Sequence, residues 1–388
     1  MKDFVFHVPT KVFFGTNQTE AYAQAVSRLG KKAMVMIGGG SAKKIGAYDD
    51  VVNALHTAGV QTVDFSGIKP NPLVEDAEAA IAQAKAEKVD LIVAIGGGSV
   101  IDTAKLVAAG ARQEQPAWNI VTGQVKVKDA LPLAVVLTLS ATGSEMDSSS
   151  VLTNADTTEK FGWGSPLVLP AVTLENPAYT TSVNAWHTAA GTADIMSHVM
   201  EQYFSLDEES YLQDAMSEAV LRTAIHFGPQ AIAHPDDLNA RANLMWASSW
   251  ALNGLLSTGK HQPWSVHDIE HELSAEYDLT HGIGLAILTP HWLRHVHNEA
   301  TRPRIARFAR EVFGISSADP AEQAEQGIQA LSEFFASMKI PMTLHEVGID
   351  ATRFEKMAEH VTSHRGGTIK GFQPLAKDDV LAIYQAAL

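Results

Sequence analysis

Two segments in the second half of the chain place metal-ligating side chains four residues apart. Asp194 and His198 lie in GTADIMSHVMEQYF, His267 and His271 lie in WSVHDIEHEL, and His281 follows in LTHGIGLAILTP. Side chains four residues apart on a helix lie on one face, so each pair can reach a common ligand. Histidine nitrogens with one carboxylate suit a borderline divalent ion such as Zn²⁺ or Fe²⁺, whereas Mg²⁺ and Ca²⁺ prefer oxygen ligands. The spacing therefore predicts a metal site carried on helices and does not select its metal.

The chain contains 16 histidines, and most of them have simpler roles. A single histidine is more often a surface residue or a hydrogen-bonded core residue than a metal ligand. We assign this simpler role to His7, His56, His226, His234, His345, His360 and His364.

Two glycine-rich turns in the first half of the chain are typical of phosphate binding. Each reads Gly-Gly-Gly-Ser, follows a short apolar segment (32–37 or 90–95) and precedes a helical pattern. Glycine lets the backbone approach a ligand closely, and the N–H groups of the following helix favour negative charge. Neither turn fits the G-x-G-x-x-G pattern, because Lys43 and Ile101 stand in the place of the third glycine. Together with a third apolar segment that ends in polar residues, the turns predict a nucleotide site that includes Gly38, Gly39, Gly40, Ser41, Gly97, Gly98, Ser99, Thr138, Thr142, Gly143 and Ser144.

The first of these turns also bears on which dinucleotide binds. An acidic side chain there would suit the ribose hydroxyls of NAD and would repel a 2′-phosphate. Gly39, Gly40 and Ser41 are uncharged, and Lys43 and Lys44 follow them. We therefore predict that NADP(H) is preferred over NAD(H); the alternative is that both lysines are simply solvated.

The order of the predicted elements indicates two domains. Apolar strands at 32–37, 60–65, 90–95 and 131–139 alternate with helical patterns, which indicates a parallel sheet covered on both faces. We predict an α/β dinucleotide-binding domain at residues 1–181 and an all-helical metal-binding domain at residues 182–388. Prolines punctuate the helical segments of the second domain, namely Pro229, Pro235, Pro263, Pro290 and Pro341. Its predicted helices are 183–204, 208–233, 236–258, 264–277, 300–313 and 321–338.

Composition excludes several classes of function. The formal net charge of −15 argues against a general affinity for nucleic acids or anionic membranes, which need basic patches. Cysteine is absent, so the chain has neither disulfides nor thiolate metal ligands. The first residues lack the apolar core of a signal peptide, and no apolar run is long enough to span a bilayer. We expect a cytoplasmic protein with a small-molecule substrate.

These motifs together resemble the iron-containing (group III) alcohol dehydrogenase family, in particular its NADP-dependent butanol dehydrogenase and broad-specificity aldehyde reductase branch. The segments that carry the resemblance include DLIVAIGGGSVIDTAK, TLSATGSE, GTADIMSHVMEQYF and THGIGLAILTPHW, in family order. The resemblance implies a Rossmann-like domain followed by a helical domain, which is the architecture of dehydroquinate synthase. It also implies a homodimer.

The resemblance further implies a role for individual residues. Asp194, His198, His267 and His281 would be the metal ligands, with Fe²⁺ as the expected ion and Zn²⁺ as the alternative. His271 would face the catalytic cleft, where it is our candidate for moving a proton. Trp264 and Asp268 depart from the family pattern, and we expect them to affect the substrate pocket more than the metal. The residues implied to hold the cofactor are Gly97, Gly98, Ser99, Asp102, Thr138, Leu139, Thr142, Ser144 and Lys160.

The resulting prediction is an oxidoreductase that transfers a hydride between NADP(H) and short- to medium-chain alcohols or aldehydes. The metal would polarise the substrate oxygen, and the nicotinamide would give or take the hydride. One alternative is a glycerol dehydrogenase-like polyol oxidoreductase, or the related dehydroquinate synthase, although both have other residues around their ligand histidines. A second alternative is a non-catalytic dinucleotide-binding subunit, against which the complete ligand set argues.

Overall fold

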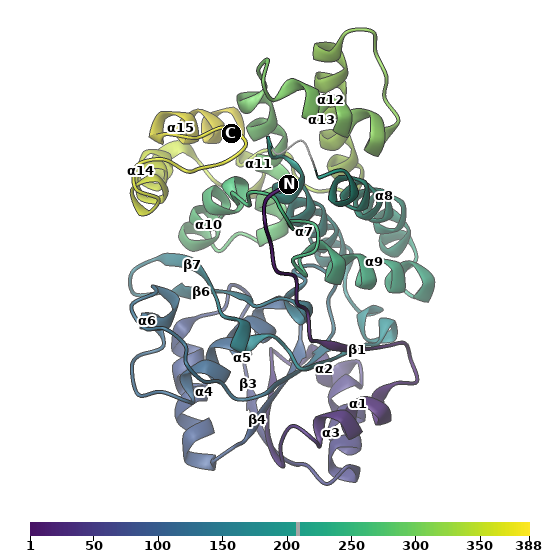
Figure 1. The fold of residues 1–388 in the computed structure, drawn as a ribbon, viewed down its shortest axis with the longest axis vertical. Helices are drawn as coiled ribbons and strands as arrows, with labels where there is room; N and C mark the ends of the chain where they lie inside the picture. The colour runs from purple at the N-terminus through teal and green to yellow at the C-terminus, as the bar shows by residue number, and fades with distance from the viewer. Residues whose placement is uncertain (207–209) are drawn as a thin grey trace. The chain divides into compact units, whose positions relative to one another are not determined.

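The computed structural model describes residues 1–206 and 210–388. The chain forms two compact units (Figure 1). The α/β unit consists of His7–Val183 and Pro235–Asn253, and the helical unit consists of Met1–Phe6, Asn184–His234 and Gly254–Leu388. The chain thus passes from one unit to the other two residues after the predicted boundary.

Helix α9 (Leu238–Ala251) differs from the predicted division of the chain. Its sequence has helical periodicity, and we expected it in the second domain. It belongs instead to the α/β unit, because its Met245 is fully buried in the hydrophobic core of that unit. Periodicity identifies the helix and does not identify the core against which its apolar face packs.

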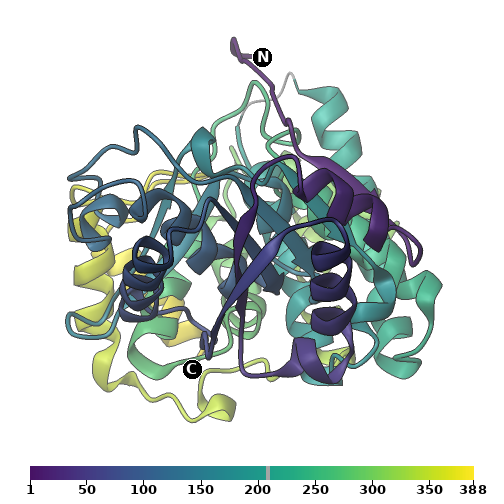
Figure 2. The same cartoon turned by 90° about the horizontal axis from the view of Figure 1, so that it is seen from below.

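A six-stranded parallel sheet forms the centre of the α/β unit, with the strand order β1-β8-β5-β4-β2-β3. Successive side chains of β2 (Lys32–Ile37) point to opposite faces of the sheet. Met34 and Met36 pack in the cluster that contains residues of α4 and α5, whereas Val35 and Ile37 pack with residues of α1 and α3. Figures 1 and 2 show these helix pairs on the two faces of the sheet. The predicted Rossmann-like parallel sheet is confirmed.

The four predicted strands correspond to β2, β3, β4 and β5, and each observed end lies within two residues of the predicted one. The short strands β1 and β8 and the antiparallel hairpin β6–β7 were not predicted. In chain order the elements are β1 (Lys11–Phe14), α1 (Thr19–Val26), β2 (Lys32–Ile37), α2 (Ser41–Lys44), α3 (Ala47–Thr57), β3 (Gln61–Ser66), α4 (Val74–Glu87), β4 (Leu91–Gly96), α5 (Gly98–Gly110), α6 (Trp118–Val121), β5 (Leu133–Leu137), η1 (Ser144–Met146), β6 (Ser149–Asn154), β7 (Glu159–Gly164), η2 (Pro166–Val168), β8 (Val172–Glu175), η3 (Pro177–Thr180) and α9.

The helical unit contains the remaining helices, so the predicted combination of an α/β part and a helical part is confirmed. Two of the prolines expected to punctuate the helical segments, Pro229 and Pro290, lie inside α8 and α11. Residues 208 and 209, where the predicted helix 208–233 begins, are outside the described residues. The elements are α7 (Ala185–Tyr203), α8 (Tyr211–Ala233), α10 (Ser265–Tyr277), α11 (His281–Val296), α12 (Arg302–Phe313), α13 (Pro320–Ser337), η4 (His345–Val347), η5 (Ala351–Arg353), α14 (Phe354–His364) and α15 (Lys377–Ala386).

Across residues 1–206 and 210–388, no helix combines the length and the apolar composition that crossing a bilayer requires.

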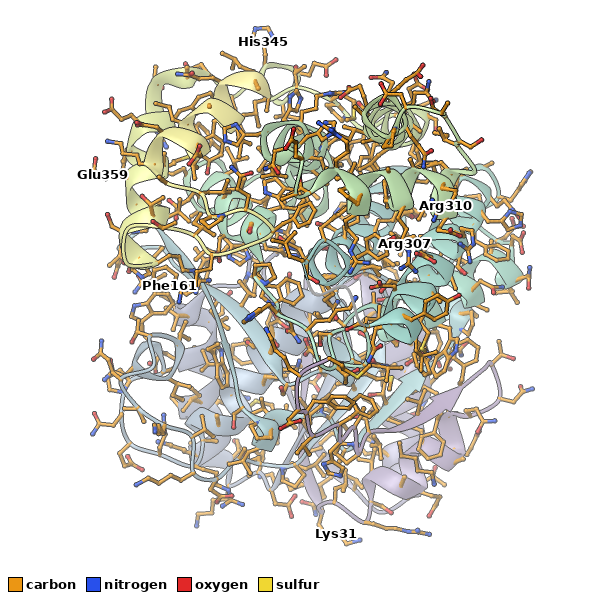
Figure 3. The ribbon with its side chains drawn as sticks, turned by 45° about the horizontal axis from the view of Figure 1, so that its top comes forward. Lys31, Phe161, Arg307, Arg310, His345 and Glu359 are labelled. Carbon is orange, nitrogen blue, oxygen red and sulfur yellow. The ribbon has the colours of Figure 1, made fainter. Side chains whose placement is uncertain are left out.

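Buried charges join α8 and α12 to the segment that precedes α10. The fully buried carboxylate of Asp214 on α8 pairs with Lys260, Arg304 and Arg307. Arg307, labelled in Figure 3, also donates a hydrogen bond of 2.8 Å to Glu218. Removing one partner of a buried ion pair costs about 3–5 kcal/mol, because the remaining charge is left uncompensated. The network therefore holds these parts of the helical unit in a fixed arrangement.

Candidate metal centre and cofactor-binding turns

Helix α7 carries two of the four candidate metal ligands on one face. Asn184 caps the helix by accepting a hydrogen bond from the backbone N–H of His187. Asp194 and His198 are 3% and 6% exposed, and Asp194 Oδ1 lies 3.6 Å from His198 Nδ1. The predicted pair at i and i+4 is therefore buried and close together.

Helices α10 and α11 bring the other two candidate ligands to this pair. His267 lies in the first turn of α10, and its ring centroid is 4.8 Å from that of His198 and 5.3 Å from that of His281. His281 is the first residue of α11, and its Nε2 lies 3.9 Å from Asp194 Oδ1. Possible ligand atoms of Asp194, His267 and His281 all lie within 4.8 Å of one another. Three helices thus bring together the four residues predicted as ligands.

Two glycines allow α11 to place His281 at this position. A Cβ atom at Gly282 would overlap the carbonyl oxygen of Ala190 on α7, so the backbones of the two helices touch there. A Cβ atom at Gly284 would lie 2.6 Å from Oε1 of Glu270 on α10. Any larger residue at position 282 would push the start of α11 away from α7, and His281 would move with it.

The unpartnered atoms of the cluster fit a divalent cation. Within the described residues, His198 Nδ1 and His267 Nε2 are buried and have no hydrogen-bond partner. Burial and the neighbouring His267 and His281 hold the pKa of His198 well below its usual value, so its ring is neutral and keeps a lone pair. Leaving a buried polar atom unpaired costs about 1–3 kcal/mol. Three imidazoles and a carboxylate are the donors that Fe²⁺ or Zn²⁺ prefers.

Two carboxylates that were not predicted from the sequence lie next to the candidate ligands. Glu201 on α7 accepts a hydrogen bond of 3.2 Å from the Nδ1 of His267. Burial lowers the pKa of His267, but the hydrogen bond and the charge of Glu201 outweigh it, so the pKa lies above its usual value. Glu270 on α10 is paired with Nδ1 of His281. The general preference of metal-bound histidines for a carboxylate at the second nitrogen could have pointed to both residues.

His271 lies beside the cluster rather than among the four ligands. It is one turn after His267 on α10 and partly exposed, and its ring centroid lies 5.4 Å from that of His281 and 6.4 Å from that of His267. Together with Glu270 and His281 it forms a second group whose ligand atoms lie within 4.8 Å of one another. His271 therefore lies next to His281 and outside the group of four candidate ligands.

The two departures from the family pattern have different surroundings. Trp264 packs edge-on against His198 and His267, with ring centroids 6.1 Å and 5.2 Å away. Asp268 is buried and paired with Arg365. This ion pair connects α10 to the end of α14, and the effect of Asp268 on the substrate pocket stays a prediction.

The second glycine turn packs tightly against the loop that follows β5. Gly97 precedes α5, and Gly98 is its first residue. A Cβ atom at Gly97 would lie 3.1 Å from Cβ of Leu139, and one at Gly98 would overlap the side chain of Thr142. The backbone N–H of Thr138 donates a hydrogen bond of 3.0 Å to the carbonyl of Gly96. Ser99 and the other N-terminal residues of α5 therefore lie at the same edge of the sheet as the polar residues that follow β5.

Asp102 and Ser144, predicted as cofactor-binding residues, contact each other. Ser144 Oγ donates a hydrogen bond of 2.6 Å to Asp102 Oδ1 and accepts one of 2.7 Å from Lys105 Nζ. Burial raises the pKa of Asp102 to about 6, although Lys105 and Ser144 act to lower it. Lys160 on β7 donates to Asn71 Oδ1 at 2.9 Å. The contacts of Ser144 hold the side chain of Asp102 on α5.

The first glycine turn connects β2 to α2. Gly38 follows the strand, Gly39 comes next, and Gly40 has a φ of +107°, a conformation that favours glycine. Ser41 begins α2, and the ammonium group of Lys43 lies 4.5 Å from the ring centroid of Tyr48.

Comparison with known proteins identifies the family. Residues 9–177 match the iron-containing alcohol dehydrogenase family, and residues 188–388 match the C-terminal part of the Fe-containing alcohol dehydrogenase family. The chain is 44% identical over 386 residues to NADH-dependent butanol dehydrogenase A of Clostridium acetobutylicum, covering 99% of each chain. It is 33% identical over 390 residues to the NADPH-dependent aldehyde reductase YqhD of Escherichia coli, covering 100% of both.

The structure leads to the same family. It superposes on NADH-dependent butanol dehydrogenase A from Thermotoga maritima with a TM-score of 0.96 and 36% sequence identity, over 100% of this chain and 99% of the other. The chain therefore belongs to the iron-containing alcohol dehydrogenase family and is an alcohol/aldehyde oxidoreductase that depends on a metal and a nicotinamide cofactor.

Proposed function

We propose that this enzyme transfers a hydride between NADP(H) and short- to medium-chain alcohols or aldehydes. In this proposal Asp194, His198, His267 and His281 hold one Fe²⁺, or Zn²⁺ in its place. The observation that carries the proposal is the convergence of these four side chains from three helices, three of them buried and His281 partly exposed, with buried nitrogens of His198 and His267 left for a cation. The bound metal would polarise the substrate oxygen, and the nicotinamide would supply or accept the hydride.

The cofactor-binding residues form part of the same proposal. Backbone N–H groups at the start of α5 would bind the pyrophosphate, because a helix N-terminus favours negative charge. The packing of the two loops around Gly98 supports a close backbone approach there. The residues proposed to hold the cofactor are Gly38, Gly39, Gly40, Ser41, Gly97, Gly98, Ser99, Asp102, Thr138, Leu139, Thr142, Ser144 and Lys160.

The first turn supports a preference for NADPH. Gly39, Gly40 and Ser41 carry no charge that would repel a 2′-phosphate, and two lysines follow them. The relatives divide on this point, since the butanol dehydrogenases are named NADH-dependent and the aldehyde reductase is named NADPH-dependent.

Replacing both Lys43 and Lys44 by alanine should lower the ratio of kcat/KM for NADPH over NADH. A hydrogen bond to a charged group contributes about 1.5–3 kcal/mol, so we expect the ratio to fall about tenfold or more. The control is Lys31→Ala, an exposed lysine before β2, which should leave the ratio unchanged. A wild-type enzyme that clearly prefers NADH would contradict the proposed preference.

His271 is proposed to move the proton that accompanies hydride transfer, directly or through water. Replacing it by alanine should lower kcat by about 100-fold, within the usual range for general acid–base catalysis. The metal content should stay at the wild-type level, because His271 is not among the four proposed ligands. An unchanged kcat and pH profile would refute the proton role, and loss of the metal would make His271 a ligand.

The overall activity is tested by following NADPH absorbance after addition of butanal, with and without a metal chelator. Consumption of NADPH that the chelator abolishes supports the proposal. Oxidation of glycerol in preference to butanol would favour a polyol oxidoreductase instead. Binding of the dinucleotide without turnover of any aldehyde or alcohol would favour a non-catalytic subunit.

We also propose that the protein is a cytoplasmic homodimer. The run Phe4, Val5 and Phe6 is 51%, 95% and 45% exposed, which is unusual for consecutive apolar side chains and suits a partner chain. Light scattering on the purified protein would give the mass of the assembly.

A further inference from the structure

The rings of two proposed metal ligands each contact a buried carboxylate through Nδ1. Nδ1 of His267 bonds to Glu201, and Nδ1 of His281 pairs with Glu270. Glu201 is 3% exposed and Glu270 is fully buried. An ionised carboxylate can only accept a hydrogen bond, so each Nδ1 carries the proton and each Nε2 keeps its lone pair. Nε2 of His267 is buried and has no hydrogen-bond partner among the described residues. Nε2 of His281 lies 3.9 Å from Oδ1 of Asp194.

Glu201 has a second set of contacts at the start of α10. It accepts hydrogen bonds of 3.0, 2.7 and 2.9 Å from the backbone N–H groups of Ser265, Val266 and His267. These are among the N–H groups that a helix leaves unpaired at its N-terminus. A single side chain of α7, the helix of Asp194 and His198, therefore fixes both the start of α10 and the ring of His267.

Glu270, unlike Glu201, has partners that are close to it in the sequence. Its Oε1 accepts a hydrogen bond of 2.7 Å from Ser274 Oγ, which leaves Oε2 for the ring of His281. The missing side chain of Gly284 provides the space for this carboxylate. The contacts of Glu270 thus orient one imidazole without capping a helix.

We infer that Glu201 and Glu270 are positioning residues that select the ring orientation and tautomer of His267 and His281 and thereby raise the affinity of the site for its divalent metal. The inference rests on the proposed metal site. Partners of this kind typically change metal affinity by about 10- to 100-fold when they are replaced.

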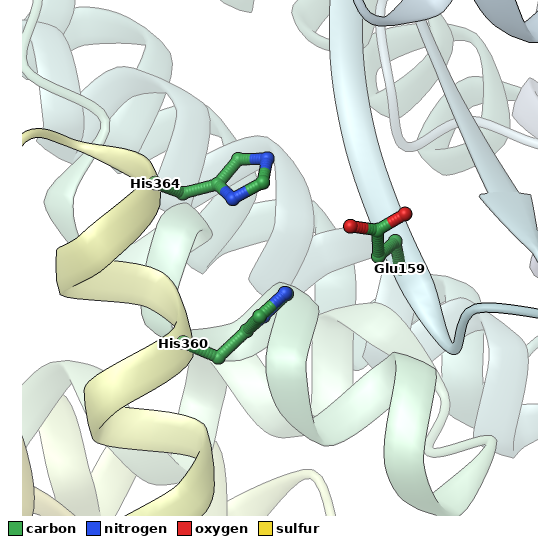
Figure 4. Close-up of side chains that lie close together, drawn as sticks. All are labelled: Glu159, His360 and His364. Carbon is green, nitrogen blue, oxygen red and sulfur yellow. The ribbon is translucent and has the colours of Figure 1, made fainter.

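The same helix offers a matched control. Glu272 of α10 is buried and bonds through both oxygens to Nδ1 of His360 on α14, at 2.9 and 3.0 Å. His360 and His364 lie one turn apart on α14 (Figure 4) and are not among the proposed ligands. Glu272→Gln therefore removes a comparable buried carboxylate–histidine bond from α10 at a different place.

The test is the dissociation constant for Zn²⁺ of the tag-free chain of residues 1–388, measured by competition with a chromophoric chelator. Glu201→Gln and Glu270→Gln should each weaken binding about 10- to 100-fold, whereas Glu272→Gln should leave it unchanged. Unchanged affinity in the first two variants, or an equal loss in Glu272→Gln, would overturn the inference. If the wild-type chain binds no stoichiometric Zn²⁺, the proposed metal site itself fails.

A measurement on the wild-type chain avoids variants that fold poorly. In the Zn²⁺-loaded protein with ¹⁵N-labelled histidine, NMR should show His267 and His281 protonated at Nδ1 and bound to the metal through Nε2. Coordination through Nδ1 in either ring would overturn the inference for that residue.

Discussion

His267→Ala is expected to lose bound metal and enzymatic turnover together. The variant removes one of four ligands and leaves the buried carboxylate of Glu201 without its ring partner. A metal acting as a Lewis acid contributes several kcal/mol to stabilising the transition state, so kcat should fall by at least about 1000-fold. The measurement combines elemental analysis of the purified variant with the rate of NADPH oxidation by butanal.

The control for this variant is His345→Ala. His345 is exposed on η4 and labelled in Figure 3, and it makes no part of the candidate centre. Its replacement should leave the metal content and kcat at wild-type values. A His267→Ala protein that is metal-free and fully active would refute the assignment of the ligands.

Gly282→Ala is expected to weaken metal binding although it changes no ligand. The added methyl group would overlap the carbonyl oxygen of Ala190, so the first turn of α11 must move away from α7. That turn begins with His281, whereas Asp194 and His198 lie on α7. Overpacking of this kind lowers the free energy of unfolding by about 1–3 kcal/mol. The displaced ring of His281 would also weaken metal binding. Thermal unfolding and Zn²⁺ titration of the same sample measure the two effects.

Gly162→Ala is the matched control for this prediction. Gly162 lies on β7 of the α/β unit, and a Cβ atom there would meet only Val151, at an ordinary distance of 3.8 Å. The Gly162→Ala variant should bind the metal with wild-type affinity. Wild-type metal affinity in Gly282→Ala would show that the contact between α7 and α11 does not position His281.

The sequence predicted the elements and residues that have a local signal. Fully buried parallel strands such as β2 and β4 appear as short apolar runs, and their ends were predicted to within one residue. The pair Asp194 and His198 was predicted because spacing on one helix is a local property. The strands β1 and β8 have four residues each, too few for such a pattern.

The remaining features depend on contacts between distant parts of the chain. Glu201 reaches His267, 66 residues later in the sequence. A carboxylate partner for a ligand histidine could be expected in general, but the sequence alone does not show which glutamate lies beside which ring. The apolar face of α9 has helical periodicity, but its packing on the α/β core depends on the folded path of the chain. Asp268 was singled out because it departs from the family pattern, and its partner Arg365 is visible only in the structure.

The central claim is that one divalent metal, held by Asp194, His198, His267 and His281, is required for alcohol and aldehyde turnover. The most direct test is metal analysis of anaerobically purified protein, with NADPH oxidation by butanal measured before chelation, after chelation and after addition of Fe²⁺. We predict one metal ion per chain, predominantly iron, with activity that is lost on chelation and restored by Fe²⁺. Undiminished turnover by metal-free protein would contradict the claim.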